Sequence, residues 1–467
     1  MLDNKKILTG LFGPLFIIIS MFLSIGKDFY LVNSFFNSYT SNVDIYFATL
    51  LMVALIVNFL FSPFQEYFIE QIKYSSTIDF KILYSLSSIA LLILILLSLQ
   101  IIYLSNLSHK LITIINLSML ILSFPLIYLY SFLFNGNKNY LISFSALLFN
   151  FLSIIFIFFL NNSFNSNYPL VSLSLFNIFF QILIFIYFCI TIKQGLLRNN
   201  PLIKKNSISF KILNRKTVAL ILGNFLLIGP FYFFFVFDFF SYTGNVTIFS
   251  LGIKPLVFFQ VFTTFFINSI LFDTLYTQPA KSDKFNYSFN LMFSVIILVI
   301  IFTFLFLTLF LPYLFIYLNL SIDNKQSIID IFIFSVAIFP IIFFNMFALK
   351  FISLKGHFKF IYILFLAYSL FYSLLFFELL IIDSFKFYIS FFFATNFMVM
   401  IVTLFGLFVL RYFKFFTFVN ILINLFLFLS IMLSFYLNLY VLIIIFSFLY
   451  LLIIYSNFYL KGILSFG

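Results

Sequence analysis

Long apolar runs follow one another along almost the whole chain and decide what it can fold into. Fourteen runs of about 20 residues, the length that a helix needs to cross a bilayer, alternate with short polar breaks. Hydrophobic residues make up 64% of the 467 residues and charged residues only 8%, against about 25% in soluble domains. The runs do not alternate with a period of two, so we expect helices. The sequence predicts an all-α integral membrane protein of about 14 transmembrane helices.

The expected spans have ends set by polar or charged residues. The last two form one apolar stretch of 46 residues, which suits a helix hairpin around Asn438. The expected spans are 8–26, 45–63, 82–104, 111–134, 141–160, 169–192, 217–239, 247–272, 289–318, 328–349, 359–382, 387–410, 415–436 and 438–460.

Basic residues divide unevenly between the two sides of this arrangement. With a cytoplasmic N-terminus, 20 of the 25 Lys and Arg residues fall inside and four outside, as the positive-inside rule requires. Seven of them lie in the loop 193–216, whose charges suit an anionic inner leaflet. We therefore expect a multi-pass protein of the cell (inner) membrane with both termini cytoplasmic. The net charge of +12 reflects this topology and gives no reason to invoke a nucleic-acid partner.

One motif occurs twice. SYTSNVDIYF begins at Ser38 and SYTGNVTIFS at Ser241, with six of ten positions identical. A second, fainter pair is PLIYLYSF at Pro125 and PIIFFNMF at Pro340. Both pairs relate an expected span to the sixth span after it, so the two halves share one orientation. This pattern is typical of parallel repeats related by an axis along the membrane normal.

The repeat predicts four segments. Two parallel six-helix lobes surround a central cavity, which suggests alternating access. The segments are the first lobe at 1–192, a basic cytoplasmic linker at 193–216, the second lobe at 217–411 and a C-terminal helix pair at 412–467.

Four charged residues near the expected outer ends of the spans are candidates for a binding site. Lys254 lies about 10–15 Å into its span, counted from Gly244, where a charge usually faces a cavity or a partner. No carboxylate lies within one turn of it in the same span, so its partner comes from another helix or from the ligand. A Lys254 that reaches the outer interface is the alternative.

The other three candidates lie in the first two spans. Lys27 and Asp28 stand at the outer end of the first span, either in a substrate site or as an interfacial pair. Asp44 opens the second span, where a carboxylate can cap the helix N-terminus or couple transport to an ion. The sequence shows no spacing for metal ligands, and we expect no metal and no cofactor.

The neighbourhood of these residues resembles the MurJ-type lipid II flippases of the MOP superfamily. In that family an S-R-x-L-G-x-x-R-D pattern in helix 1 precedes D-A-F-F in helix 2, and here SMFLSIGKD begins at Ser20 and DIYF at Asp44. The family's helix 8 has G-S-V-S with an arginine ten residues after the glycine, and here GNVT at Gly244 precedes Lys254. The turns NGNKNYLISFSALLFN and ALKFISLKGHFK are also similar.

The resemblance implies a cavity lined by cations from helices 1, 2 and 8. Here the two helix 1 arginines fall on Met21 and Lys27, the helix 8 arginine on Lys254, and the helix 2 arginine near Val57, where it is absent. Two lysines lack the bidentate geometry that arginine gives to a pyrophosphate. Another polyprenyl-linked sugar, for an O-antigen, capsule or exopolysaccharide, is therefore at least as good a substrate as lipid II.

We expect a transporter that is not an enzyme. It would flip a polyprenyl-pyrophosphate-linked sugar precursor, of peptidoglycan or of another surface polysaccharide, from the inner to the outer leaflet by alternating access. Its expected partners are that lipid-linked sugar and membrane lipids, with a coupling ion and other polysaccharide-assembly proteins as further candidates. The alternatives are a MOP-type drug or cation exporter, which would favour intramembrane carboxylates, and a membrane-embedded polysaccharide polymerase or transferase.

Overall fold

Helices account for nearly all of the chain that the structure describes. The structure is a computed structural model, and it describes residues 4–57, 64–65, 68, 80–101, 107–135, 138–163, 168–198, 215, 218–223, 245–254, 290, 293, 297, 301, 320–379, 385–410, 415–436 and 449. These residues contain no strand. The prediction of an all-α membrane protein is confirmed.

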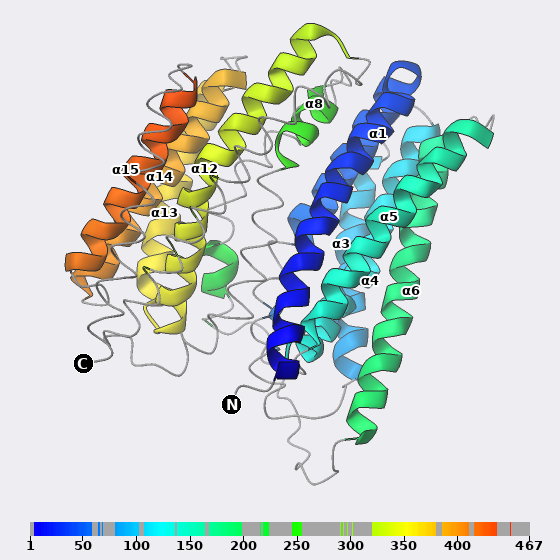
Figure 1. Ribbon diagram of the computed structural model, residues 1–467, viewed down its shortest axis with the longest axis horizontal. Helices are drawn as coiled ribbons and strands as arrows, with labels where there is room; N and C mark the ends of the chain where they lie inside the picture. The colour runs from blue at the N-terminus through cyan, green and yellow to red at the C-terminus, as the bar shows by residue number, and fades with distance from the viewer. Residues whose placement is uncertain are drawn as a thin grey trace. The chain divides into compact units, whose positions relative to one another are not determined.

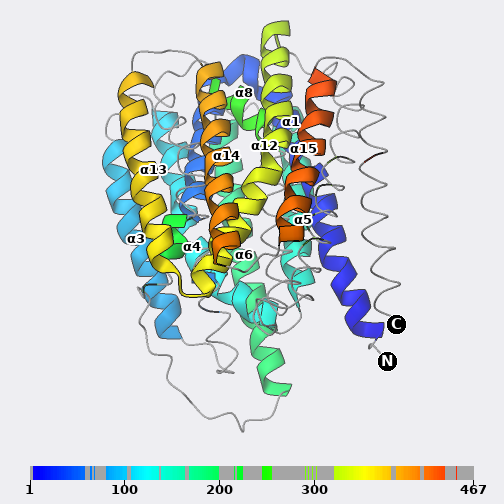
Figure 2. The same cartoon turned by 90° about the vertical axis from the view of Figure 1, so that its left-hand side faces the viewer.

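The first helix contains the first expected span, 8–26, and residues 45–56 of the second. α1 runs from Asn4 to Ile56 and is broken at Tyr39, whose φ of −142° and ψ of 43° are not helical. At a rise of 1.5 Å per residue a straight helix of this length would cross a bilayer twice over. Figures 1 and 2 show that the ribbon of α1 instead turns back near its far end. The residues expected to form a loop, 27–44, are thus helical on both sides of the break.

Four further helices pack with α1. α4 contacts α3, α6 and α1, and α5 lies along α1 (Figure 1). Their ends lie within a few residues of the expected spans because each apolar run ends at polar residues that suit the interface. They are α3 (Phe80–Ile101), α4 (Leu107–Asn135), α5 (Asn139–Ser163) and α6 (Pro169–Arg198).

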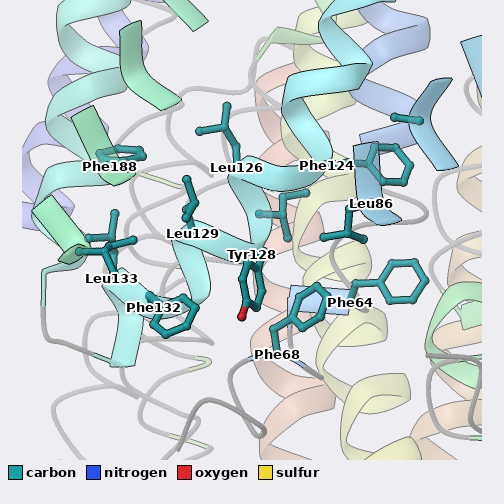
Figure 3. Packing of buried hydrophobic residues seen from close by; sticks show 13 residues of the cluster. Phe64, Phe68, Leu86, Phe124, Leu126, Tyr128, Leu129, Phe132, Leu133 and Phe188 are labelled. Atoms are coloured by element: carbon teal, nitrogen blue, oxygen red, sulfur yellow. The ribbon is translucent and has the colours of Figure 1, made fainter. Parts of the chain in front are cut away.

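An aromatic cluster fills the space around the later half of α4 (Figure 3). Tyr128 is fully buried, and its ring meets Phe68 edge-on at 5.0 Å and Phe132 at 5.1 Å between centroids. Phe64, four residues before Phe68, packs on the same cluster. This spacing places both rings on one side of a helical turn, so the segment after the second span is anchored to α4.

Four long helices are described between residues 320 and 436. Hydrogen bonds between buried polar groups join two of them: Asn345 of α12 donates from Nδ2 to the carbonyl of Asn396 in α14 at 2.9 Å. In lipid such bonds contribute about 0.6 kcal/mol each on average. The helices are α12 (Ile322–Leu354), α13 (Phe358–Leu379), α14 (Phe385–Val409) and α15 (Phe415–Tyr436).

The turns α4–α5 and α12–α13 close in the same way. The amide of Lys138 donates to the carbonyl of Leu133 at 2.8 Å, and the amide of His357 donates to the carbonyl of Ile352 at 3.1 Å. In both turns the amide three residues further on donates back to the carbonyl of that lysine or histidine. The second turn has Gly356 at φ +83°, a conformation that glycine adopts without steric cost. In the sequence, these two turns were related only because each is similar to a turn of the same protein family.

Five described helices are long and apolar enough to cross a membrane. Most of each of the expected spans 217–239, 247–272, 289–318 and 438–460 lies outside the described residues, so the count of fourteen stays a prediction. The chain divides into two compact units, one of Met1–Lys254, Leu318–Ile328 and Ile361–Tyr372, the other of Pro255–Tyr317, Ile329–Phe360 and Ser373–Gly467. The candidate site lies wholly within the first unit. The four segments expected from the repeat also stay a prediction.

Candidate functional site

Lys254 forms an ion pair with Asp28, on a helix more than 200 residues earlier in the chain. Its Nζ contacts Asp28 Oδ2, and the side chain of Asp28 is 3% exposed. Lys254 follows the short helix α8 (Asn245–Gly252), which lies against α1 (Figure 1). α8 ends three residues before Pro255, in keeping with the restriction that proline places on the residues before it. The partner that the sequence required from another helix is therefore Asp28.

Lys27 joins the same cluster from the other side of Asp28. Its Nζ lies 3.7 Å from Asp28 Oδ1 and 5.2 Å from the ring centroid of Phe149 on α5. The distance to Phe149 is within the range of a cation–π contact. Lys27 is a buried residue, so the pair Lys27–Asp28 is not an exposed interfacial pair. One carboxylate thus lies between two ammonium groups, all three of them in an apolar setting.

Asp44 contacts the beginning of α8. Its Oδ1 accepts a hydrogen bond from the backbone amide of Thr247 at 3.0 Å and another from the Thr247 hydroxyl at 2.5 Å. Both residues are buried. The first amides of a helix lack partners within it, and a carboxylate there is favoured by the helix dipole. Asp44, expected to cap the second span, therefore caps a helix of the other half of the chain.

Buried amides hold α1 in place next to these charges. Asn150 of α5 donates from Nδ2 to the carbonyl and to the hydroxyl of Ser20, both at 3.0 Å. Asn177 of α6 donates to the hydroxyl of Tyr46 at 3.0 Å. The partners of these amides on α1 flank its charged residues. Ser20 lies seven residues before Lys27, and Tyr46 lies two residues after Asp44. An amide in an apolar span is costly unless it is bonded, and each bond here fixes α1 against a neighbour.

All four residues proposed from the sequence lie at the contact of α1 with α8 and its following turn. Sequence reasoning missed the residues that position them: Phe149, Asn150 and Thr247. The signal for Asn150 was a lone amide inside an apolar run, and Thr247 was noted only as the counterpart of Asp44 in the repeat. Phe149 carried no signal, because the chain holds 83 phenylalanines. Glu66, Glu70 and Asp273, expected at the inner ends, lie outside the described residues.

The arrangement can bind an anion. Among the described residues, two ammonium groups share one carboxylate, so their charges sum to +1. Lys254 is the more accessible cation, with a side chain 22% exposed against 11% for Lys27. Among the described residues, no group of three or more His, Cys, Asp or Glu side chains is placed to hold a metal ion.

Comparison with known proteins gives a match in structure and none in sequence. No protein-family model matches the chain, and no curated protein matches it. A solved structure of the lipid II flippase MurJ in an inward closed conformation is similar, with a TM-score of 0.51 and 17% sequence identity. The match covers 96% of this chain and 99% of that one. The chain has the MurJ fold. The resemblance predicted from the sequence is confirmed at the level of the fold.

Within the MurJ fold, this chain departs where the family resemblance predicted arginines. Met21 is 5% exposed and fills an apolar position. Val57 is partly buried against the aromatic cluster of Figure 3. The two family positions with cationic residues, Lys27 and Lys254, are the two that meet at Asp28.

Proposed function

We propose that the protein is a membrane transporter that flips a lipid-linked sugar precursor from the inner to the outer leaflet. The observation that carries this proposal is the cluster of buried Lys27 and Asp28 with the partly exposed Lys254 at the contact of α1 with α8. A surplus positive charge in an apolar setting needs an anion. The phosphate headgroup of a lipid-linked sugar supplies that anion on a molecule that already lies in the membrane. Similarity in fold to the lipid II flippase MurJ supports the same class of cargo.

The finer parts of the proposal concern the carrier and the route. The substrate is a polyprenyl-linked sugar for peptidoglycan, O-antigen, capsule or exopolysaccharide. It enters from the cytoplasmic leaflet, and the two six-helix lobes alternate between inward-open and outward-open states. Lys254 and Lys27 bind the phosphate, and Asp28 holds both in place when the site is empty. Asp44 and Thr247 close α1 against α8 on the outer side.

A drug or cation exporter is the second candidate, and the buried carboxylates of Asp28 and Asp44 favour it. In such proteins an exposed, unpaired carboxylate would bind the cation. Here Lys254 neutralises Asp28, and Thr247 supplies two hydrogen bonds to Asp44. Both carboxylates already have favourable contacts, so the flippase accounts better for the lysines.

A flipping assay in proteoliposomes tests the proposal. A fluorescent polyprenyl-linked sugar is reconstituted with the purified protein, and its transfer to the other leaflet is followed by quenching with an impermeant reductant. We expect protein-dependent transfer that is lost in Lys254→Gln at equal reconstitution. Transfer no faster than in protein-free liposomes, or energy-dependent export of organic cations by cells that carry the protein, would contradict the flippase proposal. Equal transfer by wild type and Lys254→Gln would contradict the role of Lys254.

A further inference from the structure

We infer that the cluster of Lys27, Asp28 and Lys254 selects a lipid headgroup with a single negative charge, a phosphodiester, over a pyrophosphate. This inference deepens the proposed function and rests on it. It narrows the carrier to lipids joined to the sugar through one phosphate, in place of the pyrophosphate linkage that we expected from the sequence.

The charge balance of the cluster is the first step. Both oxygens of Asp28 face an ammonium group: Oδ1 lies 3.7 Å from Lys27, and Oδ2 contacts Lys254. Two cations and one anion leave one positive charge. The remaining described contact of Lys27 is the ring of Phe149, which attracts a cation without adding negative charge. Among the described residues, the cluster is therefore balanced by a ligand that carries one negative charge.

The burial of Asp28 and Lys27 makes an uncompensated net charge in the cluster costly. Asp28 is 2% exposed and Lys27 is 9% exposed. In an apolar setting, charges are tolerated when they are neutralised and costly when they are not. A phosphodiester brings one charge and makes the cluster neutral. A pyrophosphate that joins two groups brings two charges and leaves a net negative charge beside the carboxylate of Asp28.

The next carboxylate acts in the same direction. Asp44 contacts Thr247, which precedes Lys254 by seven residues, or roughly 10 Å of helix. Its charge is stabilised locally by the first turn of α8. At that distance it reduces the positive potential of the cluster, so it too opposes a second negative charge on the ligand.

The presence of lysines and not arginines in the cluster favours a single phosphate, as the charge balance does. All three arginines of the chain, Arg198, Arg215 and Arg411, lie near expected inner ends of spans. Both cations of the cluster are lysines, each a compact charge without the fork of a guanidinium. Two such charges beside one carboxylate can surround a single phosphate from two sides, and they offer no second pair of donors to a neighbouring phosphate.

A binding experiment with two matched lipids tests the inference. Geranylgeranyl-phosphate-glucose and geranylgeranyl-diphosphate-glucose compete for the full-length protein in phosphatidylcholine nanodiscs against the radiolabelled monophosphate. We expect wild type to prefer the monophosphate lipid by about tenfold or more. Asp28→Asn raises the charge of the cluster by one, so it shifts the ratio of the two affinities toward the diphosphate by a similar factor. Asp28→Glu keeps the charge and restores the wild-type ratio.

The outcomes separate this inference from the proposed function. A wild-type preference for the diphosphate, or a ratio that Asp28→Asn leaves unchanged, overturns the inference while the flippase proposal stands. If the protein binds neither of the two lipids, the proposed function itself is contradicted. Phosphatidylglycerol is a third competitor. If it competes as well as the monophosphate lipid, the site selects a singly charged headgroup, but the ligand is a glycerophospholipid and not a lipid-linked sugar. Asp330→Asn, which removes a carboxylate at an exposed position of α12, is the matched control and leaves the ratio as in wild type.

Discussion

Asp44 and Thr247 hold the same position in the two copies of the repeated motif, and they are hydrogen-bonded to each other. The 203 residues between them equal the offset between the copies. In a two-fold arrangement, a residue touches its own counterpart only close to the axis. We propose that the pseudo-two-fold axis of the two halves passes through this contact. The contact then joins the repeat and the candidate site, because the ion pair of Asp28 lies along the same pair of helices.

An exchange of these two residues tests the pseudo-symmetry. Thr247→Asp alone places two carboxylates together, and Asp44→Thr alone removes the cap of α8, which costs about 0.5–2 kcal/mol. The double variant Asp44→Thr/Thr247→Asp restores the hydrogen bond with the two side chains exchanged, because the two positions are related by the two-fold axis. We expect thermal unfolding in detergent to show both single variants less stable than the double. A double variant less stable than either single variant would contradict the two-fold relation.

A disulfide at the same contact tests the movement of α1 against α8. The side-chain oxygens of Asp44 and Thr247 lie 2.5 Å apart, so cysteine side chains at these two positions would face each other. In a Cys189→Ser background, we expect Asp44→Cys/Thr247→Cys to form the crosslink on oxidation and to stop flipping until a reductant is added. Each single cysteine variant under the same oxidant is the control. Crosslinked protein that flips at the uncrosslinked rate would rule out separation of α1 from α8 during transport.

The sequence predicted the helices better than their contacts. α4 and α15 follow the apolar runs closely, because hydropathy and length fix where a span can begin and end. The unbroken course of α1 through Lys27 and Asp28 was not predicted, since charged residues normally mark the end of a span. They are tolerated there because Lys254 approaches from a distant helix, and apolar runs do not reveal which helices are neighbours.

The sequence predicted which residues form the site but not which of them contact each other. Lys254 was evident as a charge inside a span, and its need for a partner followed from the cost of an unpaired charge. The choice of Asp28 depends on the packing of α1 against α8, where Thr247 bonds to Asp44, and on buried amides such as Asn150 that hold α1 against α5. Their partners are more than a hundred residues away, so one sequence does not identify them.

Cysteine labelling tests the expected topology. The uneven division of basic residues predicts that the loop 193–216 is cytoplasmic and the loop 161–168 exterior. In the Cys189→Ser background, an impermeant thiol reagent added to intact cells should label Asn165→Cys and not Lys204→Cys. Permeabilised cells, in which both variants should react, provide the control. Labelling of Lys204→Cys from outside would reverse the proposed orientation and, with it, the direction of flipping.

Gly406 of α14 allows a close approach of Phe360 from α13. A methyl group at Gly406 would lie 2.9 Å from Cζ of that ring, so Gly406→Ala should displace it at a cost of about 1–3 kcal/mol. We expect a lower melting temperature in detergent and recovery of it by the second change Phe360→Leu. Gly26→Ala is the matched control, because its added methyl group meets no atom within 4 Å. A Gly406→Ala variant as stable as wild type would show that the two helices separate readily.

Lys254 and Asp28 should depend on each other for stability, and transport should depend on Lys254 itself. Loss of one partner of a buried ion pair leaves the other unpaired, which costs about 3–5 kcal/mol. We therefore expect Lys254→Gln to lower the melting temperature. Asp28→Asn/Lys254→Gln removes both charges and should recover most of the stability without recovering flipping, because the phosphate has lost its more accessible cation. Lys254→Arg should keep both stability and flipping, since the guanidinium can pair with the carboxylate and with a phosphate. Thermal unfolding and flipping are measured on the same preparations, so that folding and function are compared at equal reconstitution. Recovery of flipping in the double variant would show that Lys254 serves only to neutralise Asp28.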